Sequence, residues 1–264
     1  MTSIADNHVV SGGGDAFPAL VLKRASKRFG AVTALDGISL GVHHGEVLAL
    51  LGDNGAGKST LIKCLSGVHR LDSGTIEMDG QRVSLHTPAD ARAHGVETVY
   101  QDLALFDNLR PTDNFYAGRE LAGPSWAPRS LRFLRRKQMT QSTREVLERL
   151  QVELPDFHAT VGLMSGGQRQ AVAVSRAAAF ASKVVILDEP TAALGVRESR
   201  RVLDLILRLR SENRAVIVVS HAMDHVMEVA DRAIVLRRGR KVGELIPSTE
   251  TYEQIVSLIV GGGE

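Results

Sequence analysis

The residues best suited to chemistry in this 264-residue sequence form a glycine-rich stretch at 52–59. It reads Gly-Asp-Asn-Gly-Ala-Gly-Lys-Ser and matches the pattern G-x-x-x-x-G-K-[ST], between an apolar stretch at 46–51 and a helical pattern at 58–67. Glycines let backbone N–H groups surround phosphates, a helix N-terminus adds a positive dipole end, and Lys58 can neutralise the β- and γ-phosphates. The hydroxyl of Ser59 can bind Mg²⁺. We therefore predict a site for ATP and Mg²⁺, with these nucleotide contacts: Gly52, Asp53, Asn54, Gly55, Ala56, Gly57, Lys58, Ser59 and Thr60.

Two adjacent carboxylates follow a second apolar stretch. Residues 184–187 read Val-Val-Ile-Leu and are followed by Asp188 and Glu189. In ATPases with such a phosphate-binding loop, the acid at the end of a strand holds Mg²⁺, so Asp188 is the predicted metal-side residue. A neighbouring carboxylate can take a proton from the attacking water, which makes Glu189 the predicted general base. The alternative, a strand that simply ends in two solvated acids, does not account for the phosphate-binding loop.

A second anion site is predicted ahead of another helix. Ser165, Gly166, Gly167 and Gln168 directly precede the helical pattern of residues 169–180, so their amides would lie at a helix N-terminus. One nucleotide does not need two such sites in one chain. We expect this second site to cap the γ-phosphate bound by another copy of the chain, in a head-to-tail pair that holds two ATP molecules.

The alternation of strand and helix patterns predicts an α/β fold. Apolar stretches at 184–188, 215–219 and 232–236 alternate with helical patterns at 197–210 and 222–230, which is typical of a mostly parallel sheet. Stretches at 20–24, 38–42 and 75–79 look like antiparallel strands of a β subdomain, with Asp79-Gly80 as a hairpin turn. Between about 105 and 175 strand signals vanish, which predicts an inserted helical subdomain. We expect a flexible tail at 1–19 and one ATPase domain at 20–264.

Composition excludes several classes of protein. The chain has 44% hydrophobic and 23% charged residues, and its 32 basic and 30 acidic residues nearly cancel, so no nucleic-acid partner is expected. Its longest apolar runs fall far short of the roughly 20 residues of a bilayer-spanning helix, and its start does not resemble a secretory signal. The single cysteine, Cys64, is expected to be a core thiol on a helix in a reducing compartment.

Taken together, the motifs resemble those of ABC transporter ATPases. The resemblance covers about 20–260 and rests on the phosphate-binding loop, the LMSGGQ stretch at 163–168 and LDEPT at 187–191. It implies a P-loop ABC ATPase core, with Phe29 stacked on adenine, Gln101 sensing Mg²⁺ and the attacking water, and His221 contacting the γ-phosphate. Read alone, Phe29 could be a core ring, Gln101 a polar loop residue and His221 a cap at the end of a strand.

A finer resemblance is to sugar importers of the ribose, xylose and fructose type. LGDNGAGKSTLIKCLSGV, HTPADARAHGVETVYQDLAL, FYAGRE and EPTAALGVRES are similar to that group, and the last is most similar to the fructose-import ATPases. The resemblance implies a peripheral ATPase on the cytoplasmic face of the inner membrane. Its implied partners are a second ATPase copy, transmembrane permease subunits and, indirectly, a periplasmic sugar-binding protein. Residues 102–120, which follow Gln101, are expected to contact the permease.

Some features depart from the family pattern or allow other readings. Met164 replaces the usual leucine before Ser165, a change of similar volume that should be mild. Gly195 stands where many relatives place an aspartate that bridges the two nucleotide sites. A basic group between 129 and 137 could contact acidic lipid headgroups or a partner, or be a solvated helix face. Two other functions remain open at this point: a non-transport ABC ATPase acting on DNA or ribosomes, and a module that holds nucleotide without hydrolysis.

Overall fold

The computed structural model describes residues 17–123 and 133–261. Most of the expected tail at 1–19 lies outside these residues, and so do Arg129 and Arg132 of the basic group. None of the described helices is long and apolar enough to cross a bilayer.

A six-stranded sheet forms the centre of the molecule, in the order β12-β11-β3-β10-β9-β6. The five strands from β11 to β6 run parallel to one another, and the edge strand β12 is antiparallel to β11. Every residue of β3 and β10 is buried, as expected for parallel strands covered on both faces. The strands are β3 (Val47–Leu51), β6 (Val96–Val99), β9 (Val184–Asp188), β10 (Ala215–Val219), β11 (Arg232–Arg237) and β12 (Arg240–Leu245).

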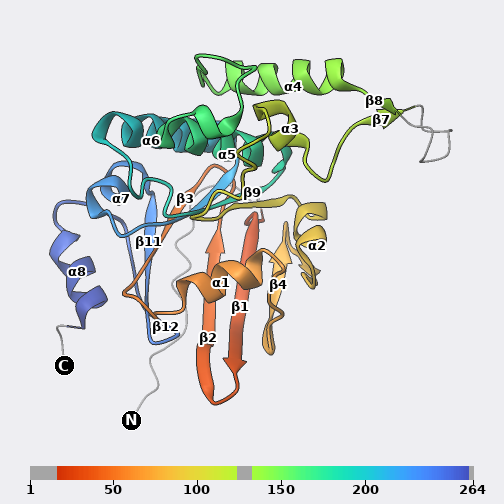
Figure 1. Cartoon of the computed structure of the whole chain (residues 1–264). Helices are drawn as coiled ribbons and strands as arrows, with labels where there is room; N and C mark the ends of the chain where they lie inside the picture. The colour runs from red at the N-terminus through yellow and green to blue at the C-terminus, as the bar shows by residue number, and fades with distance from the viewer. Residues whose placement is uncertain (1–16, 124–132, 262–264) are drawn as a thin grey trace, which may run out of the picture.

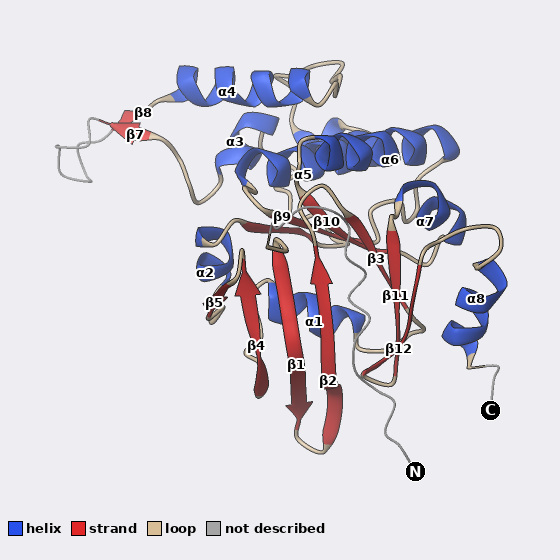
Figure 2. Ribbon diagram, turned by 180° about the vertical axis from the view of Figure 1, so that it is seen from behind, coloured by secondary structure: helices blue, strands red, loops and turns tan. Residues whose placement is uncertain are grey.

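A second, antiparallel sheet has the order β2-β1-β4-β5 and stands beside the first (Figures 1 and 2). Helix α1 (Lys58–Leu65) packs between the two sheets, and its buried Leu61 and Ile62 join one core with residues of both. The β4–β5 hairpin turns at Asp79-Gly80, as predicted. The strands are β1 (Leu20–Phe29), β2 (Val32–Val42), β4 (Ser73–Met78) and β5 (Gln81–Val83).

The remaining elements pack around the two sheets or form a separate helical group. Helices α3, α4 and α5 lie together at one end of the molecule (Figure 1) and share a separate apolar cluster that includes Phe115, Met139 and Val172. Within 105–175 the structure adds one feature that the sequence did not predict, a pair of two-residue strands. The elements are α2 (Pro88–Ala93), α3 (Pro111–Tyr116), β7 (Ala122–Gly123), β8 (Phe133–Leu134), α4 (Arg136–Arg149), the 3-10 helix η2 (Val161–Leu163), α5 (Gly166–Phe180), α6 (Val196–Ser211), α7 (Met223–Val229) and α8 (Tyr252–Val260).

Individual residues behave as their types predict. Cys64 is buried in α1, and burial raises the pKa of its thiol to about 11, so it is a core thiol rather than a nucleophile. Met164 is buried in the cluster of α3, α4 and α5, which accords with a mild exchange for leucine. Helix α1 ends two residues before the range the sequence predicted, because Gly67 lies at φ +75° and a Cβ there would approach the carbonyl oxygen of Thr87 to 2.2 Å.

Candidate active site

The glycine-rich loop connects β3 to α1 and is shaped by two glycines. Gly52 lies at φ +146°, and a Cβ there would approach the carbonyl oxygen of Leu236 in β11 to 2.3 Å. Gly57 lies at φ +106°, and a Cβ there would come within 2.7 Å of the carbonyl oxygen of Ala34 in β2. Both positions combine a backbone conformation that favours glycine with contact to another strand. The loop is therefore fixed between the two sheets, with the N-terminus of α1 at its end.

Lys58, the first residue of α1, points its ammonium group back into this loop. Its Nζ donates to the carbonyl oxygen of Gly52 at 2.7 Å and to that of Asp53 at 3.0 Å. The side chain is buried, and burial lowers the pKa of Lys58, against the attraction of Glu189, Asp188 and Asp53. The charge is thus held close to the amides on which phosphates would bind.

The two carboxylates at the end of β9 are partly desolvated. Burial raises the pKa of Asp188, although Lys58 opposes this shift. Burial also raises the pKa of Glu189, and the electrostatic attraction of His221 opposes this shift. The Nε2 atom of His221 lies 3.3 Å from Oε1 of Glu189, and that oxygen is buried without a hydrogen bond. A buried acceptor that lacks a donor can receive one from a water molecule, which is the geometry a general base needs.

A cleft of about 520 Å³ brings most of the predicted residues together. Residues 54–60 of the phosphate-binding loop and the start of α1 line it. The other predicted residues in its wall are Gln101, Asp188, Glu189 and His221. Gly52 and Asp53, at the start of the same loop, do not line the cleft. The sequence missed five further lining residues, which have no motif of their own: Val32, Thr33, Ala34, Ala192 and Val219.

Phe29, the predicted adenine contact, is not one of the residues that line this cleft. Its ring is 44% exposed and meets the ring of His69 edge-on at 5.1 Å, with the Lys27 ammonium 5.4 Å from its centre. The alternative that Phe29 is a core ring is therefore wrong. The direct partner of Phe29 across the β1–β2 hairpin is Val32, which does line the cleft. The role of Phe29 as the adenine platform stays a prediction.

The oxygen ligands in the cleft suit Mg²⁺ bound together with a nucleotide. Ser59, Asp188 and Gln101 offer a hydroxyl, a carboxylate and an amide oxygen, and Mg²⁺ prefers such oxygen ligands with phosphates and waters completing its shell. Mg²⁺ would neutralise phosphate charge there and offset the repulsion from Asp188.

The predicted second anion site has the expected position at the start of α5. Ser165 is the N-cap: its Oγ accepts from the Gln168 amide at 3.3 Å, and Oε1 of Gln168 accepts from the Ser165 amide at 2.9 Å. The capping box uses these two N–H groups, and the amides of Gly166 and Gly167 are the remaining donors of the first turn. None of the four residues lines the cleft described above.

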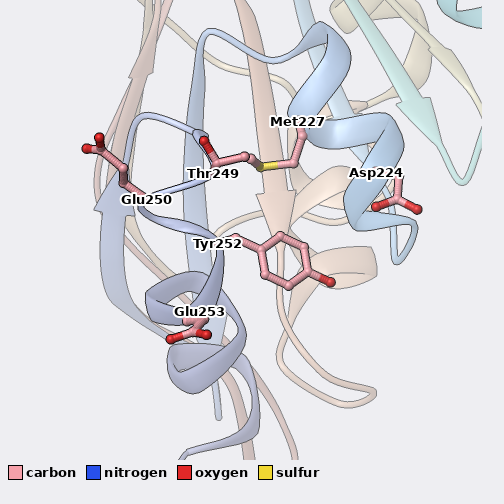
Figure 3. Close-up of a pocket in the computed structure, with 6 residues that line it drawn as sticks. All are labelled: Asp224, Met227, Thr249, Glu250, Tyr252 and Glu253. Atoms are coloured by element: carbon pink, nitrogen blue, oxygen red, sulfur yellow. The ribbon is translucent and has the colours of Figure 1, made fainter.

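Another cleft, of about 550 Å³, lies between α7 and the start of α8 (Figure 3). Its wall contains three carboxylates, those of Asp224, Glu250 and Glu253, together with Met227, Thr249 and Tyr252. These acids would repel a triphosphate. The two cavities have similar volumes, and the cleft beside Lys58 is the one whose charges suit a nucleotide.

The profile of the ABC transporter family matches residues 35–192. The chain belongs to the ABC transporter family. It is 46% identical to the fructose import ATP-binding protein FrcA of Rhizobium meliloti over 94% of this chain and 95% of that protein. It is 43% identical to the xylose/arabinose import ATP-binding protein XylG of Sulfolobus acidocaldarius, over 91% and 93% of the two chains. The ribose import ATP-binding protein RbsA of Yersinia pestis is 39% identical, with 92% of this chain covering 46% of that longer protein.

Solved structures show the same fold. A nucleotide-free ATP-binding cassette from an ABC transporter superposes with a TM-score of 0.76 at 24% identity, over 92% of this chain and 98% of the other. A dimeric bacterial ABC transporter cassette, MJ0796, gives a TM-score of 0.71 at 22% identity, over 87% and 99%. The chain is accordingly an ATPase of the ABC transporter family with the fold of an ATP-binding cassette.

The desolvated Asp188 gives this ABC ATPase a testable pH dependence without nucleotide. A raised folded-state pKa means that the ionised carboxylate opposes folding above that pKa, and that this cost disappears as the pH falls through it. We expect Asp188→Asn to raise the melting temperature of the nucleotide-free protein at pH 7 by roughly 1–4 °C. The difference should shrink as the pH falls through the raised pKa of Asp188, where the parent protonates this carboxylate itself. Calorimetry across this range would contradict the assignment if the variant were less stable at pH 7.

Proposed function

We propose that two copies of this chain close head to tail on two ATP molecules and Mg²⁺, and that hydrolysis drives a separate permease to import a monosaccharide. The observation that supports the pair is the separation of two anion sites within one chain. The loop with Lys58 lies in the cleft together with Asp188 and Glu189, whereas Ser165 and its helix N-terminus lie outside it. Each site is complete only when another chain supplies the other half. A solved relative of the same fold is described as a dimer.

The proposed hydrolysis follows from the contacts in the cleft. Lys58 and the loop amides hold the β- and γ-phosphates, while Ser59, Asp188 and Gln101 surround Mg²⁺. Glu189 accepts a proton from the attacking water, and the adjacent His221 contacts the γ-phosphate. Oε1 of Glu189 lies 3.3 Å from Nε2 of His221 and both residues line the cleft, so both side chains would respond to the same phosphate.

The proposal of a sugar as cargo rests on the relatives. Their names refer to fructose, xylose, arabinose and ribose, which are all monosaccharides. Fructose is the proposed cargo because FrcA is 46% identical over nearly the whole of both chains. The permease would hold this ATPase at the cytoplasmic face of the inner membrane, with a periplasmic sugar-binding protein as an indirect partner. None of these names points to DNA or ribosomes.

Contact with the permease is proposed at the segment that follows Gln101. Phe106 is 55% exposed and is therefore not part of the core. Its backbone is nevertheless fixed, because the buried Asn114 accepts from the Phe106 amide at 2.8 Å and donates to its carbonyl at 3.0 Å. An exposed apolar ring on a fixed backbone suits docking to an apolar groove.

The proposed general base can be tested by Glu189→Gln. We expect ATP binding to persist and kcat to fall by at least about 100-fold, because an amide cannot accept the proton while the phosphate contacts remain. Steady-state hydrolysis and nucleotide binding on the purified protein would check this. Turnover within a few-fold of the parent would remove Glu189 from the mechanism, and a hydrolysis-free parent would favour the module that only holds nucleotide.

The shared site can be tested with Ser165→Arg. This chain should bind ATP but not hydrolyse it, because the cation fills the anion site offered to the partner. The lost cap should cost about 1 kcal/mol of stability, which Ser165→Ala would reproduce as a control for folding. Mixed with Lys58→Ala, which lacks the phosphate contact, the Ser165→Arg chain should regain at most one competent site per pair. Normal hydrolysis by Ser165→Arg alone would exclude the shared site.

Permease coupling can be tested with Phe106→Ala. Because the ring is exposed, we expect an unchanged melting temperature and ATPase rate for the purified chain. Sugar uptake should fall in cells that produce the variant with its permease. Arg144→Ala, on α4 in the same part of the fold, is a control for surface substitutions. Normal uptake by Phe106→Ala at normal abundance would show that the permease binds elsewhere.

A further inference from the structure

Gln101 lies in a tight turn whose backbone is unusual. Strand β6 ends at Val99, and the amide of Leu103 donates to the carbonyl of Tyr100 at 2.9 Å, which closes a turn around Gln101. The last residue of this turn and the residue after it have left-handed backbones, with φ +61° at Leu103 and +46° at Ala104. Residues with a Cβ rarely adopt this conformation, and two in succession need support from elsewhere in the fold.

One end of the turn is tied to the helix that follows the phosphate-binding loop. The hydroxyl of Tyr100 donates to Oγ of Ser66 at 2.8 Å. Ser66 is the C-cap of α1, whose first residue is Lys58. This end of the turn therefore moves with the helix that binds the chain's own ATP.

The other end is tied to the helix that begins at the second anion site. Arg176 of α5 donates from Nη1 to the carbonyl of Ala104 at 2.8 Å and from Nη2 to that of Leu103 at 2.9 Å. Both acceptors belong to the two left-handed residues. Arg176 lies about three helical turns beyond Ser165 on the same helix. A planar guanidinium suits two such parallel hydrogen bonds, and an ammonium does not.

The surroundings of Arg176 show that its charge is committed to this contact. The nearby carboxylate of Glu97 pairs with Arg119 at 2.8 Å, and Arg119 also lies over the ring of Phe180 at 4.2 Å. Burial lowers the pKa of the Arg176 guanidinium, which Glu97 opposes. Such a desolvated cation is costly unless carbonyl oxygens satisfy it.

We propose that Arg176 is a positioning residue that sets Gln101 in the cleft according to the position of α5. The turn spans two helices: α1 responds to the chain's own ATP, and α5 presents Ser165 to the ATP of a partner copy. When α5 docks on that second ATP, Arg176 places Leu103 and Ala104, and through them Gln101. The inference rests on the role proposed above for Gln101.

Arg176→Met removes the two hydrogen bonds while keeping a long side chain. We expect about a tenfold fall in kcat, since hydrogen bonds from a charged donor are lost, with ATP affinity unchanged because the phosphate-binding loop is intact. Arg176→Lys keeps the charge but not the paired geometry, and it should also lower kcat; it gives the same comparison if the methionine variant does not fold. Arg144→Met on α4, whose guanidinium lies over the ring of Phe157, is the matched control with an expected normal kcat.

A double-mutant cycle and a rescue separate positioning from general damage. If Arg176 acts through Gln101, Gln101→Ala with Arg176→Met should hydrolyse no more slowly than Gln101→Ala alone. Ala104→Gly should restore part of the kcat lost in Arg176→Met, because glycine adopts the left-handed backbone without support and the Ala104 side chain is exposed.

Three results with the Arg176 variants would overturn the inference: a normal kcat in both of them, additive losses with Gln101→Ala, or no recovery with Ala104→Gly. A normal kcat in Gln101→Ala would also overturn it, by removing Gln101 from the mechanism. That failure is distinct from failure of the proposed ATPase function, which is decided by Glu189→Gln.

Discussion

The carboxyl ends of parallel strands meet at one edge of a sheet, and the arrangement of this active site depends on that constraint. Strand β10 pairs with β3 on one side and β9 on the other, so Val219 lies opposite both Leu50 and Asp188. The phosphate-binding loop, the two carboxylates and His221 all lie at or directly after the ends of these three strands. The amide of Glu189 also donates to the carbonyl of Val219 at 2.9 Å, which ties the general-base candidate to the middle strand. Groups far apart in sequence thereby share one cleft.

The same constraint concentrates opposite charges in a partly dry space. Lys58, Asp188 and Glu189 are each desolvated, and burial shifts the pKa of each in the direction that favours the neutral form of the side chain. Their mutual attraction opposes that cost only in part. A nucleotide with Mg²⁺ brings the missing charges, so binding relieves an electrostatic cost that the fold bears without it. This is a physical reason for the cleft to favour a charged phosphate ligand over an apolar one.

Helix α5 connects the second anion site, at its N-terminus, to the turn beside Gln101. Its N-terminus offers the Gly166 and Gly167 amides, and Arg176 further along donates to the turn beside Gln101. Because a helix resists bending, displacement of one end is passed to the other. The helix also packs on α6, whose Glu198 side chain lies against the backbone of Gly167. At the N-cap of α6, a Cβ on Gly195 would come within 2.7 Å of Oε2 of Glu198, so a side chain there would require Glu198 to move.

The sequence by itself determined the chemistry and most of the scaffold, because those signals are local. The spacing of Gly52, Gly57 and Lys58 specifies a phosphate-binding loop, and the buried strands β3, β9 and β10 appear as unbroken apolar stretches. Short or half-exposed elements were missed: β6 has only four residues and β12 has no buried ones, so neither has a strong pattern.

Only the tertiary structure decided which separate segments meet. Val32, Thr33 and Ala34 join the cleft because β2 passes beside the loop, and their types give no sign of it. The same holds for Arg176, which is one arginine among many in the sequence. Only the fold brings the carbonyl groups of the left-handed Leu103 and Ala104 to its guanidinium. A motif encodes what its own backbone can bind, whereas long-range contacts depend on the packing of sheets and helices, which no local spacing records.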